Sequence, residues 1–137
     1  MKTLVVDDEL VSRKKMQRIM DDFTECEAVE SGSAAIAAFK KALENGMPFD
    51  LITLDVLMPK MDGTEALYTI REIEKEKKIP KEEQVKILMV TSHSDRDSII
   101  TSIQAECDDY IVKPFDRETI VNKLEKLGFS RFKMIFT

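Results

Sequence analysis

The sequence predicts an α/β fold in which a mostly parallel sheet of five strands is covered by helices on both faces. Short apolar runs of strand type alternate along the chain with segments whose apolar residues recur at helical spacing. Parallel neighbours need crossover connections, and the intervening helices provide them. With 137 residues, the chain is long enough for one sizeable core and too short for two ordinary domains.

The first half of the chain contains three units of a strand followed by a helix. The apolar runs that predict the strands lie at residues 3–6, 26–29 and 49–54. The first helix is predicted by a pattern of i, i+3, i+4 and i+7, formed by Met16, Ile19, Met20 and Phe23. The second helix begins at residues 31–33 and ends near residues 45–46, and the third follows the turn at residues 58–63. Their buried faces carry Ile36, Phe39, Leu43, Leu67, Ile70 and Ile73.

The second half of the chain carries the remaining strands and helices. Residues 74–84 are densely charged and contain Pro80, which predicts a frayed helix end and an exposed loop. Strands are predicted at residues 85–90 and 110–112, and we interpret Asp108-Asp109 as a loop before the second of them. One helix is predicted after each strand. The first carries Ile99, Ile100 and Ile103, and the second is capped by Asp116 and carries Ile120, Val121, Leu124 and Leu127.

The composition excludes several classes of partner. The formal net charge is −5 and the 21 basic residues are scattered, so the basic footprint of a nucleic-acid-binding protein is missing. No apolar stretch approaches the roughly 20 residues of a membrane span, and the first strand leaves no room for a signal peptide. Cys26 and Cys107 match no metal-ligand spacing and are expected to be reduced thiols. We therefore expect a cytoplasmic protein without a nucleic-acid or membrane partner.

Polar side chains collect where the predicted strands end. Asp7 and Asp8 follow the first strand, Asp55 the third, Thr91 the fourth and Lys113 the fifth. Ligands of open parallel sheets bind outside the carboxyl ends of the strands, so these side chains are expected to meet at one edge. Two carboxylates about 4 Å apart repel by roughly 4 kcal/mol at an effective dielectric near 20, so this cluster needs counter-charges.

The expected counter-charges are the Lys113 ammonium and a divalent cation. Few hard oxygen ligands, partly open to solvent, suit Mg²⁺ better than zinc or an all-protein calcium cage. A carboxylate beside such a cation can attack phosphorus, and the metal and the lysine can stabilise the charge on the transferred group. The sequence therefore predicts phosphoryl transfer onto an aspartate.

Four motifs in order along the chain resemble the receiver domain of bacterial two-component response regulators, of the chemotaxis-receiver type. They occupy residues 4–9, 55–63, 89–92 and 110–115, and the likeness extends over about residues 2–127. The resemblance implies a flavodoxin-like fold with strand order 2-1-3-4-5. It also implies a receiver domain at residues 1–127. The tail at residues 128–137 is the least family-like segment, and its Phe132, Met134 and Phe136 alternate as in a strand. It is expected to pack on its own domain, to pair with a second chain or to be disordered. The protein is expected to be a monomer or a weak homodimer.

The resemblance also implies the roles of individual residues. Asp55 would accept the phosphoryl group from a histidine of a sensor kinase or phosphotransfer protein. Asp8, Asp55 and the backbone carbonyl of Leu57 would bind Mg²⁺ directly, and Asp7 would bind it through water. Lys113 would pair with the phosphoryl oxygens, with its peptide bond to Pro114 in the cis form.

A switch is implied as well. The Thr91 hydroxyl would move toward the phosphoryl group, and Tyr110 would turn inward. The surface formed by the helix around Ile100, the strand at 110–112 and the last helix would then bind a downstream protein. The protein would act as a single domain without a DNA-binding output domain, and it would not be a turnover enzyme.

Other readings of the same residues remain open. An aspartate-nucleophile phosphohydrolase also uses Mg²⁺ and a parallel sheet, and a degenerate receiver can serve as a scaffold. Tyr110 can be a fixed, half-buried strand residue without a switching role. The chain also departs from the family where Glu106-Cys107 replaces the usual Gly-Ala, so the packing before the last strand is expected to differ.

Overall fold

The computed structural model describes residues 1–92, 97, 100, 104 and 106–129 and contains one parallel sheet. Its order is β2-β1-β3-β4-β5, and every neighbouring pair of strands is parallel. The predicted fold and strand order are therefore confirmed. The strands are β1 (Lys2–Val6), β2 (Glu25–Val29), β3 (Leu51–Asp55), β4 (Lys86–Thr91) and β5 (Asp109–Val112).

Each described α-helix follows a strand, and three of them begin at a side-chain cap. The helices are α1 (Leu10–Asp21), α2 (Gly32–Glu44), α3 (Gly63–Glu76) and α5 (Arg117–Lys126), with a short 3-10 helix η1 (Lys81–Glu83). The side chains of Ser31, Asp62 and Asp116 each accept a hydrogen bond from the backbone amide three residues on, which satisfies a donor in the first helical turn. The predicted cap at Asp116 is confirmed. The helix predicted around Ile99 and Ile103 lies largely outside the described residues.

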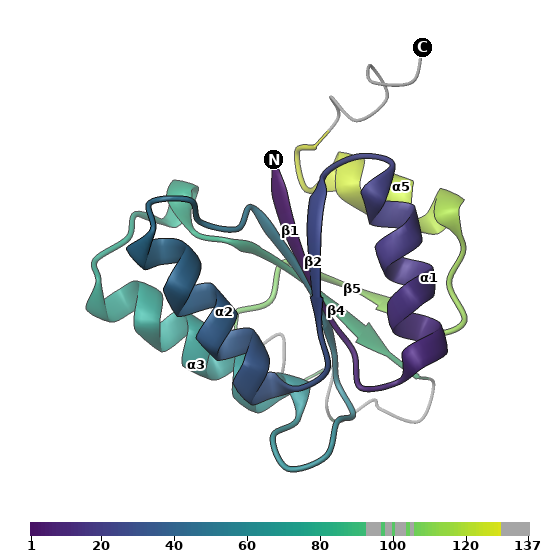
Figure 1. Ribbon diagram of the computed structural model, residues 1–137, viewed down its shortest axis with the longest axis horizontal. Coiled ribbons are helices and arrows are strands. Elements are labelled where there is room, and N and C mark those ends of the chain that lie inside the picture. Colours follow the sequence, from purple (N-terminus) through teal and green to yellow (C-terminus); the bar gives the residue numbers. More distant parts are fainter. Residues whose placement is uncertain (93–96, 98–99, 101–103, 105, 130–137) are drawn as a thin grey trace.

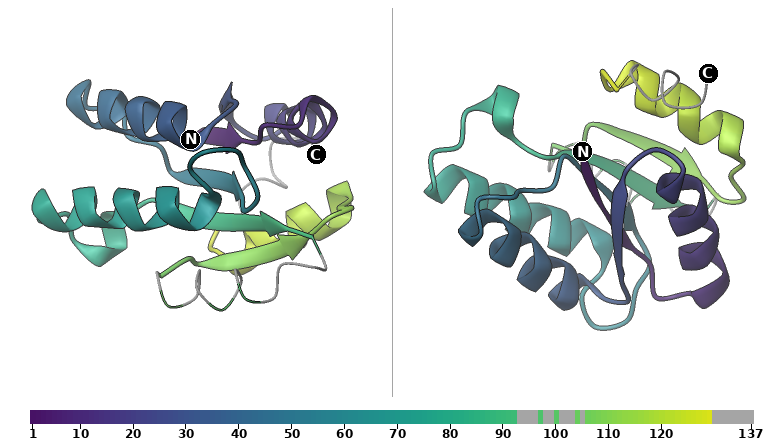
Figure 2. Two further views of the ribbon diagram at one scale, coloured as in Figure 1. Left: turned by 90° about the horizontal axis from the view of Figure 1, so that it is seen from below. Right: turned by 45° about the horizontal axis from the view of Figure 1, so that its top comes forward.

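Helices cover both faces of the sheet, as Figures 1 and 2 show. On one face, α2 and α3 pack over alternate residues of the central strands, among them Leu4, Ile52 and Ile87. On the other face, α1 and α5 pack over Val5, Leu88 and Ile111. Because both faces are apolar, β1, β3 and β4 are almost completely buried and hold a fixed register. This rigid layer positions the residues at the strand ends.

The exposed loop predicted within residues 74–84 is confirmed, because residues 75–78 and 80–83 are exposed, but the predicted fraying of the helix end is not observed. Helix α3 continues to Glu76, and Glu74 is only 1% exposed. One of its carboxylate oxygens accepts a hydrogen bond from Arg71 (2.6 Å), and the other accepts one from the backbone amide of Val85 (2.8 Å). A charged side chain can be buried when it is paired and fully hydrogen-bonded. The density of charged residues in this segment therefore did not reveal that Glu74 is buried.

The same Arg71 joins α3 to the chain that leads into β5. Its guanidinium donates to the carbonyl of Glu106 (3.1 Å) and to the carboxylate of Asp108 (2.9 Å). Asp108 also accepts the backbone amide of Ile87 (2.7 Å). Asp109 is the first residue of β5, so its assignment to a loop was wrong. These contacts fix the amino ends of β4 and β5, at the opposite edge of the sheet from the predicted site.

Two expectations from composition concern thiols and membranes. Cys26 and Cys107 are free and partly buried, and burial is the largest cause that raises the pKa of both thiols. Among the described residues, none of the helices combines the length and the apolar character that a membrane crossing demands.

Candidate functional site

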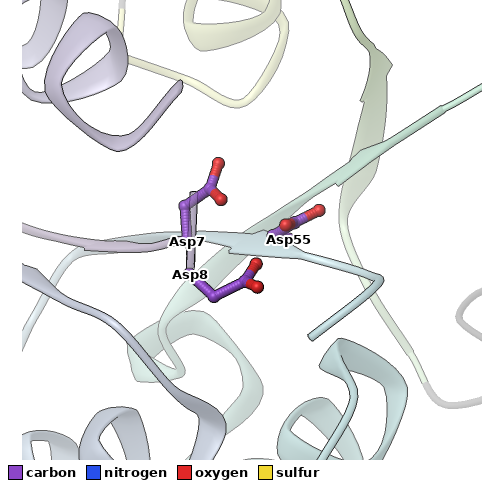
Figure 3. A group of neighbouring side chains, drawn as sticks. All are labelled: Asp7, Asp8 and Asp55. Carbon is purple, nitrogen blue, oxygen red and sulfur yellow. The ribbon is translucent and has the colours of Figure 1, made fainter. Parts of the chain in front are cut away.

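Three carboxylates meet at the carboxyl edge of the sheet. Asp7 and Asp8 follow β1, and Asp55 is the last residue of the adjacent strand β3. One oxygen from each of the three carboxylates lies within 4.8 Å of the others. Figure 3 shows the Asp8 carboxylate pointing toward the side of Asp55. Asp7 and Asp55 are 4% and 5% exposed, whereas Asp8 faces solvent, so the cluster is open on one side.

Asp7 is held through both its backbone and its side chain. Its amide donates to the carbonyl of Val29 (3.2 Å), which ties the end of β1 to β2. One carboxylate oxygen accepts the amide of Glu9 (2.9 Å), and the other lies 3.1 Å from the Lys113 ammonium. The position of Asp7 therefore depends on three separate segments of the fold.

Lys113 brings a positive charge to the two buried carboxylates. Its ammonium lies 3.1 Å from Asp7 and 3.5 Å from Asp55. Its backbone amide donates to the carbonyl of Thr91 (2.7 Å), and the peptide bond to Pro114 is cis, as expected. Burial acts to lower the pKa of Lys113, but the carboxylates of Asp55 and Asp7 outweigh it and raise the pKa above its ordinary value. The ammonium therefore stays charged.

Asp55 has a strongly perturbed acidity. Burial is the largest cause and the neighbouring Asp7 carboxylate is the second, and together they raise the pKa of Asp55 from 3.8 to about 7 despite the opposing charge of Lys113. The single ammonium of Lys113 therefore does not neutralise the negative charge of the carboxylate cluster. A cation bound beside Asp55 would favour its ionised form.

Helix α3 begins in direct contact with the Asp55 backbone. The amide of Gly63 donates to the carbonyl of Val56 (2.7 Å). A Cβ atom at position 63 would lie 2.2 Å from the carbonyl oxygen of Asp55, so only glycine permits this approach. The sequence motif contained this glycine, but its spacing gave no sign of which backbone it would meet.

The remaining predicted site residues lie around this cluster. Thr91 ends β4 next to Val112 in the register, is fully buried, and donates its hydroxyl to the carbonyl of Ser92 (3.2 Å). The Leu57 side chain is exposed. Tyr110 is 38% exposed, and the ammonium of Lys123 lies 5.5 Å from the centroid of its ring. Tyr110 therefore faces partly outward in this structure.

The donor set fits a small divalent cation. The available ligands are carboxylate oxygens from three residues, two of them buried and one facing water, and their mutual repulsion is only partly offset by one ammonium. Hard oxygen ligands with room for water are the ligands that Mg²⁺ prefers. The residues present therefore fit the predicted ion.

The fold and this edge define a class of protein, a flavodoxin-like α/β domain with an acidic cluster at the carboxyl ends of its strands. Residues 3–125 match the family model of the response regulator receiver domain. The chain belongs to this receiver family, whose members are phosphoacceptor switches of two-component signalling.

Several chemotaxis proteins are similar to this chain over nearly its whole length. Chemotaxis protein CheY-3 of Vibrio cholerae is 34% identical over 129 residues, which cover 93% of this chain and 91% of that protein. CheY of Listeria monocytogenes is 32% identical over 126 residues, covering 92% of this chain and 97% of that protein.

Two solved structures with the same fold are informative. Vibrio cholerae CheY4 superposes with a TM-score of 0.76 at 29% identity, covering 91% of this chain and 96% of that one. The receiver domain of the histidine kinase CKI1 from Arabidopsis thaliana, complexed with Mg²⁺, gives a TM-score of 0.78 at 29% identity, covering 93% and 91%.

Proposed function

We propose that Asp55 accepts a phosphoryl group from a phosphohistidine of a sensor histidine kinase or a phosphotransfer protein. The observation that carries the proposal is the position of the Lys113 ammonium, 3.1 Å from Asp7 and 3.5 Å from Asp55, at the edge where Asp8 completes a group of three carboxylates. This arrangement offers a nucleophile, a fixed cation and oxygen ligands for a second cation within one small volume.

The proposed step exchanges one bond to phosphorus for another. A carboxylate oxygen of Asp55 forms a bond to phosphorus while the bond between phosphorus and the histidine nitrogen breaks. The imidazole leaves with the electron pair of that bond and takes up a proton from water. Lys113 pairs with the phosphoryl oxygens and holds them in position as their charge shifts in the transition state. Attack of water on the same phosphorus would later release inorganic phosphate and regenerate the Asp55 carboxylate.

Asp8, Asp55 and the backbone carbonyl of Leu57 are the proposed direct ligands of Mg²⁺, with Asp7 acting through water. When bound, Mg²⁺ supplies positive charge that neutralises the carboxylates and the transferred group. Support comes from the three-carboxylate group of this chain and from the similar receiver domain of CKI1, which is complexed with Mg²⁺.

The proposed output is a change of protein-binding surface. The Thr91 hydroxyl moves toward the phosphoryl group and Tyr110 turns inward, which changes the surface of β5, α5 and the chain between β4 and β5. A downstream protein reads that surface in the cytoplasm. We propose the receiver domain at residues 1–127, in a monomer or weak homodimer. Phe129 packs against the core cluster that includes residues of α5. The rest of the tail, residues 130–137, lies outside the described residues.

Incubation with Mg²⁺ and acetyl phosphate, followed by intact mass spectrometry, tests the proposal. The wild-type protein should gain the mass of one phosphoryl group, and Asp55→Asn should not. Asp50→Asn is a matched control, because Asp50 is an exposed residue that immediately precedes the same strand, at the end away from Asp55. An adduct of equal yield on Asp55→Asn would contradict the proposal. Multiple turnover of a generic phosphate ester would instead indicate a phosphohydrolase.

A further inference from the structure

Arg13 in α1 contacts the chain that carries the acidic pair. One guanidinium nitrogen donates to the backbone carbonyl of Asp7 (3.1 Å), and another lies 3.3 Å from the carboxylate of Glu30. The Arg13 side chain is 13% exposed, whereas Glu30 is 74% exposed. The two contacts use different nitrogens, so a planar, forked donor is needed to make both.

The hydrogen bond from Arg13 to the Asp7 carbonyl adds to the other contacts that hold Asp7 in place. The amide of Asp7 is bound by Val29, and its carboxylate is bound by the Glu9 amide and by Lys113. The carbonyl of Asp7 belongs to the peptide group that leads directly to Asp8. A rotation of that peptide group would turn the Asp8 side chain, which is exposed.

Two opposite effects on cation binding are expected from an arginine at this place. Its positive charge repels a divalent cation, so that removing the charge alone would strengthen binding. Its hydrogen bond fixes the peptide before Asp8, so that removing the bond would weaken binding. Glu30 offsets part of the charge, and the pair is partly open to water, which screens what remains.

We propose that Arg13 is a positioning residue for the magnesium site, acting through the peptide group between Asp7 and Asp8. The inference rests on the proposed function, because it takes the three carboxylates as the ligands of Mg²⁺. Side chains that orient metal ligands typically change metal affinity by roughly 10- to 100-fold when they are mutated. Because Arg13 acts on one ligand through the backbone, a three- to tenfold weaker affinity, about the lower end of that range, is expected.

The test measures the dissociation constant of Mg²⁺ alone by NMR titration of the full chain. Arg13→Gln removes both the charge and the guanidinium group. Arg13→Lys keeps the charge, but its ammonium cannot contact both the Asp7 carbonyl and the Glu30 carboxylate. Arg18→Gln is the matched control, because Arg18 is an exposed residue in the last turn of the same helix. The measurement is repeated at about 1 M NaCl, where the Debye length of roughly 3 Å suppresses the effect of charge.

Both Arg13 variants should bind Mg²⁺ at least about threefold more weakly than Arg18→Gln at both salt concentrations. The amide resonance of Glu9, which is bonded to the Asp7 carboxylate, should shift in the metal-free variants. Equal or tighter binding by Arg13→Gln, or wild-type binding by Arg13→Lys, would overturn the inference. Failure of the wild-type protein to bind Mg²⁺ would instead refute the proposed function, so the two failures are distinguishable.

Discussion

Replacing Asp55 by Asn should stabilise the metal-free protein at alkaline pH. The raised pKa of Asp55 means that the folded protein prefers the protonated carboxyl group, because burial and the Asp7 carboxylate disfavour the charge. The folded pKa of about 7 lies above the ordinary value of 3.8. The stability that this preference gives is therefore complete below about pH 4 and is lost progressively as the pH rises to about 7.

The size of the effect follows from the pKa difference. About three pKa units at 1.36 kcal/mol each set an upper limit of about 4 kcal/mol. The edge is open to water on the side of Asp8, so screening reduces this, and we expect about 2 kcal/mol above pH 7. Asn is neutral at every pH and nearly isosteric. Asp55→Asn should therefore exceed the wild type by about 2 kcal/mol at pH 8 and by about 1 kcal/mol or less at pH 5.

Urea denaturation in EDTA, followed by far-UV circular dichroism between pH 5 and pH 8, measures this difference. Asp50→Asn makes the same chemical change at the exposed residue before β3, whose carboxylate accepts the Lys2 amide, and should not reproduce the gain in stability at pH 8. Adding Mg²⁺ should raise the midpoint of the wild type and leave that of Asp55→Asn nearly unchanged. A wild type as stable as Asp55→Asn at pH 8, or a gap that does not vary with pH, would refute the reasoning.

Three further predictions concern stability and are checked by urea denaturation. Gly63→Ala should destabilise the protein by about 3 kcal/mol or more, since its Cβ would lie 2.2 Å from the Asp55 carbonyl oxygen; unchanged stability would show that α3 can move away. Glu74→Gln should cost roughly 2 kcal/mol by removing one of the two carboxylates that pair with Arg71, while Glu76→Gln on the exposed side of the same helix should cost less than about 0.5 kcal/mol. Glu106→Gly should stabilise by about 1 kcal/mol, because residue 106 has a φ of 70° that glycine adopts without strain; a loss of stability would contradict this explanation.

The fold and most of the candidate site could be predicted because both depend on patterns local to the chain. Apolar runs and helical spacing identify the elements, and parallel strands must present their carboxyl ends at one edge. The convergence of Asp7, Asp55 and Lys113 follows from that geometry and is observed. Whether Asp55 is phosphorylated and which atoms bind Mg²⁺ remain predictions.

The contacts that the sequence did not reveal join segments far apart in the chain. Arg71 reaches Asp108 across 37 positions, and nothing in the local pattern distinguishes it from an exposed helix residue. Glu74 lies in a charged stretch that favours exposure, yet its helical position turns it toward the start of β4. Arg13 likewise occurs among other basic residues of α1, and only the folded chain shows that its guanidinium meets the Asp7 carbonyl.

Two groups of buried acids with basic partners lie at opposite edges of the same sheet, and they differ in how completely the acids are satisfied. Each carboxylate oxygen of Glu74 accepts a close donor, so this group stabilises the fold and loses stability when it is broken. The Lys113 ammonium lies 3.5 Å from the Asp55 carboxylate and also pairs with Asp7. The raised pKa of Asp55 shows that this one positive charge does not offset burial and the Asp7 carboxylate. Neutralising Asp55 should therefore stabilise the chain while neutralising Glu74 destabilises it. A buried acid that the fold leaves short of positive charge is stabilised by a bound cation, and this shortage occurs at the edge where we propose that Mg²⁺ binds.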